Sequence, residues 1–349
     1  MRYNRVCIES FGYELPKNIV TSLSLEERLA PIYNKLNLSY GRLEMMTGIR
    51  ERRLWDEGTP PSQVSTKAAE KAIAKSGINK EEIECLLHAS VSRDFLEPAT
   101  ATMVHDSLGL PSTATIFDIS NACLGFINGI VTLANMIELG QVKAGIVVGS
   151  ETSERVIEAT IDNLLKDQDI TRAEAKSSFA SLTLGSGAAA VVLTHSSLSK
   201  AGHRLLGGAV RTASGHNDLC RIGTDTYYFD LTSPPTMRTD VEALLKNGLA
   251  LGLDTWKAMQ QELDWSNFDV DKVFCHQVAA THRKQLLDIL GLDESKDFAT
   301  VEYLGNMGSV ALPITLAIGI EEGRLNAGDK VAMLGIGSGL VCVMLGLEW

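Results

Sequence analysis

The feature of the sequence that most constrains its fold is a strand and helix pattern that occurs twice. An apolar run at residues 83–91 is typical of a buried strand, and a similar run follows 187 residues later, at 270–278. The runs at 143–150 and 330–337 are separated by the same 187 residues. A register shared over several elements predicts an internal duplication, whereas two unrelated α/β halves would agree only by chance. Each unit is too long for a solenoid repeat, so we expect two domain-sized halves.

Helices and further strands complete each half. Helical periodicity predicts a long helix before each first strand and another helix between the paired strands. The best boundary lies near 196–203, so we expect an N-terminal half at 1–196 and a C-terminal half at 197–349. The expected helices are 64–77, 122–140, 237–264 and 308–323, and the flanking strands are 5–12, 187–195, 205–213 and 340–348.

Two segments break the symmetry between the halves. Residues 151–181 are polar and mostly helical in pattern, and residues 214–236 have the composition of a long irregular loop. Long loops on a rigid scaffold commonly form binding sites. We therefore expect both segments to line the substrate channels.

The composition disfavours several classes of protein. The chain has 349 residues, of which 45% are hydrophobic and 21% charged, and its formal net charge is -11. This acidic balance disfavours a nucleic-acid partner, and no run approaches the length of a membrane-spanning helix. The first residues lack the pattern of a signal peptide. The six cysteines form no C-x-x-C pair, so we expect reduced thiols in a cytoplasmic enzyme, without a disulfide framework or a metal site.

Cys123 is the candidate nucleophile. It lies where a strand-like run that ends at Ile119 meets the helical pattern at 122–140. Backbone N–H groups and the helix dipole at such a junction favour the thiolate, which is the nucleophilic form of cysteine. A thiolate there can carry an acyl group as a thioester. A small buried cysteine without a catalytic role is the alternative interpretation.

Three other positions carry groups that a thioester-forming cysteine needs. His276 follows an apolar strand, at the end of the sheet where open α/β folds place their sites. Asn306 lies between glycines ahead of a helix, which by itself is ordinary turn chemistry. The Gly335–Gly339 segment lacks the dinucleotide-binding fingerprint because a strand follows it. Its tight turn can still present a backbone N–H, that of Ser338, to an oxyanion.

These motifs occur in an order and at spacings that resemble a known family. The Ala-Cys-Leu-Gly-Phe segment around Cys123, the His276-Gln277 pair, the Gly305-Asn306 pair and the closing Gly-Ile-Gly-Ser-Gly are similar to the thiolase superfamily of condensing enzymes, in its ketoacyl synthase III branch. The Thr47–Arg53 segment resembles an early signature of that branch. The resemblance implies a thiolase-like α/β fold with five layers, α-β-α-β-α, made of two duplicated halves. It also implies a homodimer and a reaction without metal or redox cofactor.

One loop narrows the resemblance. Residues 90–100 are similar to the OleA group, the first condensing enzymes of bacterial long-chain olefin synthesis. The resemblance implies that Glu97 acts across the dimer, in the neighbouring active site. A carboxylate there can remove the weakly acidic α-proton of an acyl-CoA, whereas a malonyl donor forms its carbanion by losing CO₂. A solvated loop carboxylate before a proline is the alternative interpretation of Glu97.

The resemblance implies a Claisen-type condensation of two acyl-CoA thioesters into a β-keto acid. Cys123 takes the first acyl group, and its backbone N–H and that of Ser338 bind the oxyanion. His276 and Asn306 then stabilise the enolate of the second thioester. The alternative within the family is condensation of an acyl-CoA primer with malonyl-acyl carrier protein in fatty acid biosynthesis. A non-catalytic subunit is a third class, and the joint presence of the cysteine, histidine and asparagine argues against it.

Coenzyme A enters only as part of the substrate, and its phosphates need cations. Thr281 stands where the malonyl-using branch commonly has an arginine, so the usual contact to coenzyme A or a carrier protein is not expected there. Acyl carrier protein or downstream enzymes of the olefin pathway are the candidate protein partners. The candidate phosphate-binding residues, for which solvated surface charge is the alternative, are Arg50, Arg52, Arg53, Arg283 and Lys284.

Overall fold

Nine strands form one continuous mixed sheet, whose two halves (the first and the second sheet) meet edge to edge. A computed structural model of the chain describes residues 1–223 and 235–349. Two residue pairs, Cys7 with Arg204 and Ile8 with His203, join the sheets between β1 and β8. The first sheet has the order β5 (Thr115–Ile119), β4 (Cys85–Ala89), β6 (Ala144–Glu151), β7 (Gly187–His195), β1 (Val6–Glu14), and the second has the order β8 (His203–Thr212), β13 (Val341–Glu348), β12 (Lys330–Gly337), β11 (Lys272–Cys275).

The two sheets repeat one topology. In the first, β4 and β6 are parallel and β6, β7 and β1 alternate in direction. In the second, β11 and β12 are parallel and β12, β13 and β8 alternate in direction. A parallel bridge between Val273 and Asp297 lies beside β11 where β5 lies beside β4. The topology thus confirms the predicted duplication. The predicted boundary at 196/197 falls between β7 and β8 and remains a prediction.

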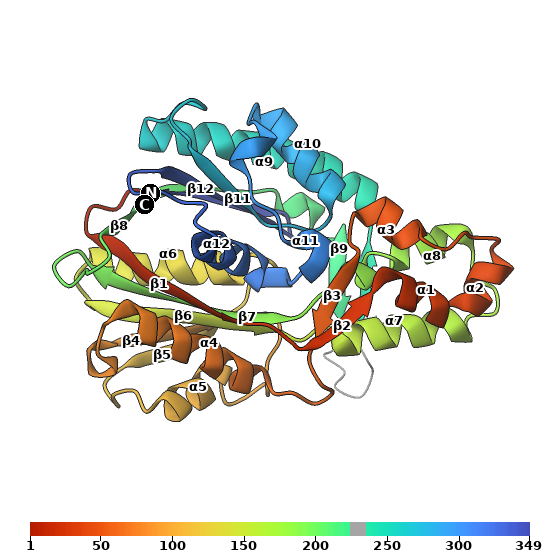
Figure 1. The fold of residues 1–349 in the computed structure, drawn as a ribbon, viewed down its shortest axis with the longest axis horizontal. Coiled ribbons are helices and arrows are strands. Elements are labelled where there is room, and N and C mark those ends of the chain that lie inside the picture. Colours follow the sequence, from red (N-terminus) through yellow and green to blue (C-terminus); the bar gives the residue numbers. More distant parts are fainter. Residues whose placement is uncertain (224–234) are drawn as a thin grey trace.

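Helices cover both sheets and fill the space between them, which gives the predicted five layers (Figure 1). Helix α12 (Ala311–Glu321) lies in the central layer. It is apolar on all sides and is buried from Ala311 to Gly319, as expected of a helix between two sheets. The central layer is α6 (Gly125–Glu138) and α12 (Ala311–Glu321), and the outer layers are α4 (Pro61–Ser76) with α5 (Thr100–Leu108) and α9 (Val241–Leu263) with α10 (Ala280–Leu290).

A smaller lobe extends from the side of the layers (Figure 1). The predicted helical character of 151–181 is confirmed by α7 (Glu154–Lys166) and α8 (Arg172–Ser178). The prediction of an irregular loop at 214–236 is wrong at 220–223 and at 236, because β9 (Cys220–Gly223) and β10 (Thr236–Thr239) pair there as a ribbon; residues 224–234 lie outside the described residues. The lobe contains α1 (Ser22–Arg28), α2 (Ala30–Lys35), α3 (Arg42–Thr47), α7 (Glu154–Lys166), α8 (Arg172–Ser178), β2 (Asn18–Thr21), β3 (Glu51–Leu54), β9 (Cys220–Gly223) and β10 (Thr236–Thr239).

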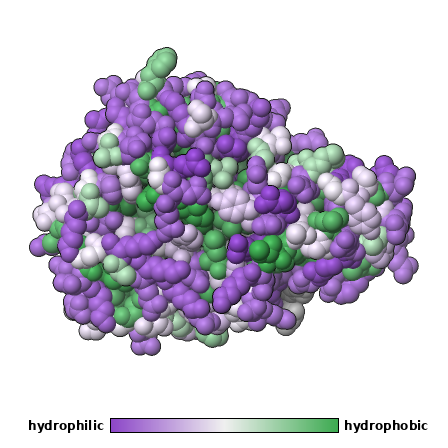
Figure 2. Space-filling model, in the orientation of Figure 1, coloured by the Kyte–Doolittle hydropathy of each residue, from purple (hydrophilic) through white to green (hydrophobic). Residues whose placement is uncertain are grey.

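The surface is mainly polar. Figure 2 shows hydrophilic residues over most of one face, with hydrophobic side chains in separate patches. None of the helices in residues 1–223 and 235–349 combines the length and the apolar character needed to cross a membrane. The apolar residues are instead collected in clusters between the layers, where burial stabilises the fold.

Candidate active site

Cys123 stands in a strained turn at the start of the central helix. Strand β5 ends at Ile119 and α6 begins at Gly125, so few residues make the connection. Ala122 has a left-handed φ of 46°. That backbone conformation costs about 1–3 kcal/mol for a residue with a side chain. The Leu124 N–H donates to the Asn121 carbonyl at 2.9 Å and closes the turn. The strain is stored directly beside the candidate nucleophile.

Cys123, His276 and Asn306 line one cavity of about 220 Å³. They come from the start of α6, from the end of β11 and from the turn that precedes α12. Residues that are far apart in the sequence thus share one site. Apolar side chains from α9, α10 and β12 line much of the remaining surface, among them Leu244, Leu249, Leu286 and Ile336.

The thiol of Cys123 is protonated at neutral pH. Burial, together with the charges of Cys220 and Glu151, raises its pKa to about 12, although its own backbone N–H acts in the opposite direction. The sequence predicted the opposite direction because the start of a helix favours a thiolate. Here the loss of hydration on burial outweighs that effect. The proton must therefore leave the sulfur as the sulfur attacks.

His276 brings a neutral ring to the cavity. Its backbone N–H donates to the Leu334 carbonyl at 2.8 Å, which holds it beside β12. Burial lowers the pKa of the imidazole to about 4. Within the described part of the chain, neither ring nitrogen has a hydrogen-bond partner. A neutral imidazole has one N–H donor and one lone pair, so the ring can donate to the oxygen of a bound thioester.

The amide of Asn306 is oriented by its own turn. Its Oδ1 accepts a hydrogen bond from the Gly308 N–H at 3.0 Å, which leaves Nδ2 as a donor. The Asn306 N–H donates to the Thr183 carbonyl and the Asn306 carbonyl accepts from the Gly185 N–H, each at 2.9 Å. At Gly305, where φ is 69°, a Cβ would lie 2.8 Å from the Thr183 carbonyl oxygen. Glycine is therefore required for this close approach.

The turn between β12 and β13 approaches the start of α6. A Cβ on Gly337 would lie 3.0 Å from Leu124 Cγ and 3.6 Å from the backbone nitrogen of Cys123. Ser338 follows it and lines the same cavity. In residues 1–223 and 235–349, the N–H groups of Cys123 and Ser338 donate no hydrogen bond to another residue. Two such free donors are what an oxyanion hole needs.

Glu97 does not reach this cavity within one chain. It is exposed on the loop between β4 and α5, and its neighbours Phe95 and Leu96 are 61% and 60% exposed. The cavity lining that the structure describes does not include Glu97. A role for Glu97 in the chemistry therefore requires a second subunit.

The predicted role of Arg52 in phosphate binding is contradicted by its position. The side chain is fully buried on β3 and lies beyond the reach of a coenzyme A phosphate. Its Nη1 donates to Ser22 Oγ at 3.1 Å and its Nη2 to the Leu182 carbonyl at 2.8 Å. Burial lowers its pKa to about 10. The sequence did not reveal the burial of Arg52, because its neighbours Arg50, Glu51 and Arg53 are charged and a charged run is typical of a solvated surface.

The other predicted cations have varied surroundings. Arg283 lines the cavity and forms an ion pair with the buried Asp297. Arg50, Arg53 and Lys284 do not belong to the described lining of the cavity. Arg50 Nε lies 3.8 Å from Glu51 Oε2. Lys284 Nζ lies 3.4 Å from Glu294 Oε1. Arg53 Nη1 donates to the Pro16 carbonyl at 3.2 Å.

Some residues of the cavity were missed in the sequence. Lys176 lines it from α8 and pairs with Glu242 at 2.9 Å, and Cys220 and His282 also belong to the lining. The only sequence signal for Lys176 was the polar helical character of its segment. In the described residues, no group of His, Cys, Asp and Glu side chains is placed to hold a metal ion.

Comparison with known proteins identifies the family. The model for 3-oxoacyl-[acyl-carrier-protein] synthase III matches residues 117–214, and the model for the C-terminal part of that enzyme matches residues 260–349. The acyl-CoA:acyl-CoA alkyltransferase of Shewanella oneidensis is 45% identical over 100% of both chains. The chain belongs to the ketoacyl synthase III family. As a member of it, this protein is an acyltransferase of the condensing type.

The chain is more similar to acyl-CoA:acyl-CoA alkyltransferases and to OleA than to a beta-ketoacyl-[acyl-carrier-protein] synthase III. The acyl-CoA:acyl-CoA alkyltransferase of Xanthomonas campestris is 38% identical over 100% of both chains, whereas the beta-ketoacyl-[acyl-carrier-protein] synthase III of Natranaerobius thermophilus is 27% identical over 97% of both. A crystal structure of Xanthomonas OleA with bound cerulenin matches with a TM-score of 0.94 and 38% identity, covering 100% of this chain and 98% of that one. The expected fold is thereby confirmed.

Solved variants of Xanthomonas OleA have a cysteine, a glutamate or a histidine replaced. The replaced glutamate and the replaced cysteine are separated by the same number of residues as Glu97 and Cys123.

Proposed function

We propose that the protein condenses two acyl-CoA thioesters, through an acyl group carried on Cys123, into a β-keto acid. The observation that carries the proposal is the apolar cavity at which Cys123 meets His276 and Asn306. A long acyl chain needs an apolar cavity, and the chemistry of its thioester needs a nucleophile and hydrogen-bond donors at the cavity wall. The two relatives named acyl-CoA:acyl-CoA alkyltransferase support the choice of substrates.

In the first half-reaction, the sulfur of Cys123 attacks the thioester carbonyl of one acyl-CoA. The sulfur–carbon bond forms, the bond to the sulfur of coenzyme A breaks, and the thiol proton leaves with coenzyme A. The N–H groups of Cys123 and Ser338 stabilise the oxyanion of the tetrahedral intermediate. Each such donor contributes about 3–4 kcal/mol to the transition state.

In the second half-reaction, the carbonyl oxygen of another acyl-CoA binds against His276 and Asn306. Glu97 of a second subunit removes the α-proton, and the two N–H donors stabilise the enolate. The carbanion attacks the acyl group on Cys123 and releases the thiol. Hydrolysis of the remaining thioester gives the β-keto acid. His276 can donate without carrying a charge because burial lowers the pKa of its ring to about 4.

A homodimer is part of the same proposal, because Glu97 is exposed and lies outside its own cavity. In this proposal, the phosphates of coenzyme A are contacted by the other candidate cations, Arg50, Arg53, Arg283 and Lys284. We place the protein in the cytoplasm, where acyl-CoA is made, with no cofactor beyond the coenzyme A of its substrates.

The alternative function is condensation of an acyl-CoA primer with malonyl-acyl carrier protein. The matching family models are named for that reaction, which favours it as the second candidate. This donor loses CO₂ to form its carbanion, so the reaction needs no base at Glu97.

One experiment separates the two functions. The protein is incubated with myristoyl-CoA alone and, in parallel, with acetyl-CoA and malonyl-acyl carrier protein. We expect release of coenzyme A and a long-chain symmetrical ketone, from decarboxylation of the β-keto acid, in the first reaction only. A product only in the second reaction would overturn the proposal in favour of the alternative.

A further inference from the structure

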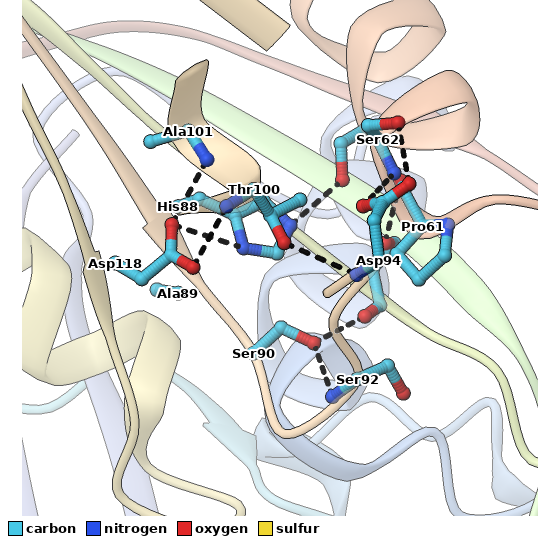
Figure 3. Close-up of polar contacts among 12 residues, drawn as sticks. Pro61, Ser62, His88, Ala89, Ser90, Ser92, Asp94, Thr100, Ala101 and Asp118 are labelled. Atoms are coloured by element: carbon cyan, nitrogen blue, oxygen red, sulfur yellow. Dashed lines mark hydrogen bonds and ion pairs between the residues drawn. The ribbon is translucent and has the colours of Figure 1, made fainter. Parts of the chain in front are cut away.

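The loop that carries the proposed base is bonded to the N-terminus of α4 and leads into the N-terminus of α5, which β5 holds (Figure 3). Asp118, on β5, accepts hydrogen bonds from the N–H groups of Thr100 and Ala101, both at 2.9 Å, at the start of α5. Asp94 accepts from the N–H of Ser62 at 3.0 Å and from its hydroxyl at 2.7 Å, at the start of α4. Free N–H groups at the start of a helix are strong donors to carboxylates. The loop is thus held in place within its own subunit.

Glu151 holds the other end of this loop. The residue ends β6 and is 6% exposed. Its carboxylate accepts a hydrogen bond from the Val91 N–H at 3.1 Å. It also accepts from the N–H of Ser92 at 3.2 Å and from the hydroxyl of Ser92 at 2.9 Å. These three bonds fix the first residues of the loop beside the end of β6.

The same carboxylate contacts the turn that holds Asn306. The Ser309 hydroxyl donates to Glu151 Oε1 at 2.5 Å, and the Ser309 N–H lies 3.4 Å from the same oxygen. Gly308 packs against the side chain of Glu151, since a Cβ built on Gly308 would lie 3.2 Å from Glu151 Cγ. The N–H of Gly308 in turn donates to Asn306 Oδ1. Glu151 therefore stands one residue away from the group that orients the catalytic amide.

We propose that Glu151 is a positioning residue for the condensation step, which holds the loop of Glu97 and the turn of Asn306 in fixed relative places. The inference rests on the proposed function, in which both residues act in that step. Asn306 serves the site of its own subunit, and Glu97 serves the neighbouring site. One Glu151 thus supports both active sites of a dimer.

Five donors converge on the two oxygens of the carboxylate, and this explains why a side chain with two acceptor oxygens is needed here. A glutamine has one acceptor oxygen, and its NH₂ group would face donors on one of the two sides. Glu151→Gln therefore keeps the shape of the side chain but releases either the loop at Ser92 or the turn at Ser309. Small displacements of positioning groups are costly because reaction geometry is exacting.

The test compares Glu151→Gln with a matched control, Glu154→Gln. Glu154 is a nearby half-buried carboxylate that accepts from the Trp55 N–H and from the Ser186 hydroxyl, and within the described residues neither of these bonds involves the loop or the turn. Two rates are measured with myristoyl-CoA: acylation of Cys123, by intact mass, and ketone formation. We expect Glu151→Gln to lower ketone formation by at least about tenfold, to retain acylation of Cys123, and to accumulate acyl-enzyme. Glu154→Gln should leave both rates unchanged.

A parallel loss of acylation and condensation would mean a merely structural role and would overturn the inference, as would unchanged condensation. Failure of the wild type to form ketone would instead refute the proposed function. If Glu151→Gln does not fold, the variants Ser92→Ala and Ser309→Ala test the inference instead. Each removes one hydroxyl that donates to Glu151 and keeps the carboxylate. Each should lower condensation without lowering acylation, and wild-type condensation in both would overturn the inference.

Discussion

Asn306 Oδ1 accepts a hydrogen bond of 3.0 Å from the backbone N–H of Gly308. The bond settles which end of the amide is available, because the oxygen is committed to the turn and the NH₂ group is left for the cavity that Asn306 lines. A backbone contact two residues away thereby makes the side chain a donor. Enolate stabilisation needs such a donor, so this orientation can be tested directly.

We predict that Asn306→Asp separates the two half-reactions. The aspartate can still accept from Gly308, but it presents a second oxygen to the enolate instead of a donor. Condensation should fall by roughly a hundredfold to a thousandfold, as on loss of an oxyanion donor. Acylation of Cys123 should persist and is measured by intact mass. Condensation at the wild-type rate would remove Asn306 from the mechanism.

We predict that Glu97→Gln abolishes condensation of two acyl-CoA molecules and still allows the Cys123 acyl-enzyme to form. The base is needed only for the α-proton of the second thioester. Cys123→Ala should lose acyl transfer altogether, which intact mass also shows. Retained full condensation in Glu97→Gln would exclude Glu97 as the base.

Mixing these two inactive variants tests the action of Glu97 across a dimer. A mixed dimer contains one site with an intact Cys123 and an intact Glu97 from the other subunit, so activity should return after subunit exchange. Each variant alone is the control. A mixture that stays inactive, although mixed dimers are detected by mass, would show that Glu97 does not act across the dimer.

The elements that the sequence predicted best are those with a clear local signal. Strand β7 matches its predicted bounds at 187–195, and β12 matches at 330–337, because both are apolar runs bounded by turn residues. The duplication was predictable because it is a comparison within one chain. The β9–β10 ribbon was missed, since its strands are short and mostly polar and gain their partners from distant residues.

The burial of side chains and the contacts between distant residues limited what the sequence could predict about the site. The sequence places Cys123 at a helix start, but it does not reveal that loss of hydration raises the thiol pKa. Arg52 belongs to a charged run and is nevertheless buried. Glu151 gave no signal, because its partners Ser92 and Ser309 are far from it in the chain and meet it only in the folded protein.

The buried ring of His276 predicts a loss of stability at acid pH. Its pKa is lowered from 6.5 to about 4 in the folded protein. The unfolded chain therefore binds a proton below pH 6.5, while the folded protein does so only near pH 4, and stability falls between these values. From pH 7.5 to pH 5 this group should cost about 2 kcal/mol of unfolding free energy.

Urea unfolding of the wild type and of His276→Asn at pH 7.5 and pH 5 measures this effect. Other buried groups, such as Asp297, titrate in both proteins and cancel in the comparison. The wild type should lose more stability than the variant on acidification. An equal loss in both proteins would contradict a neutral buried imidazole.

Gly248 offers a test of where the acyl chain lies. It is on α9 and lines the cavity, and a Cβ built on it has no neighbour closer than Ile336 Cγ2 at 3.9 Å. Gly248→Leu should fill part of the cavity and shift the preferred acyl-CoA to shorter chains. Competition among acyl-CoA substrates of graded length, with ketones analysed by mass, measures the preference. Gly248→Ala is the control, since its methyl group fits without contact strain and should stabilise the helix by about 0.5–1 kcal/mol. An unchanged length preference in Gly248→Leu would show that the acyl chain does not pass this part of α9.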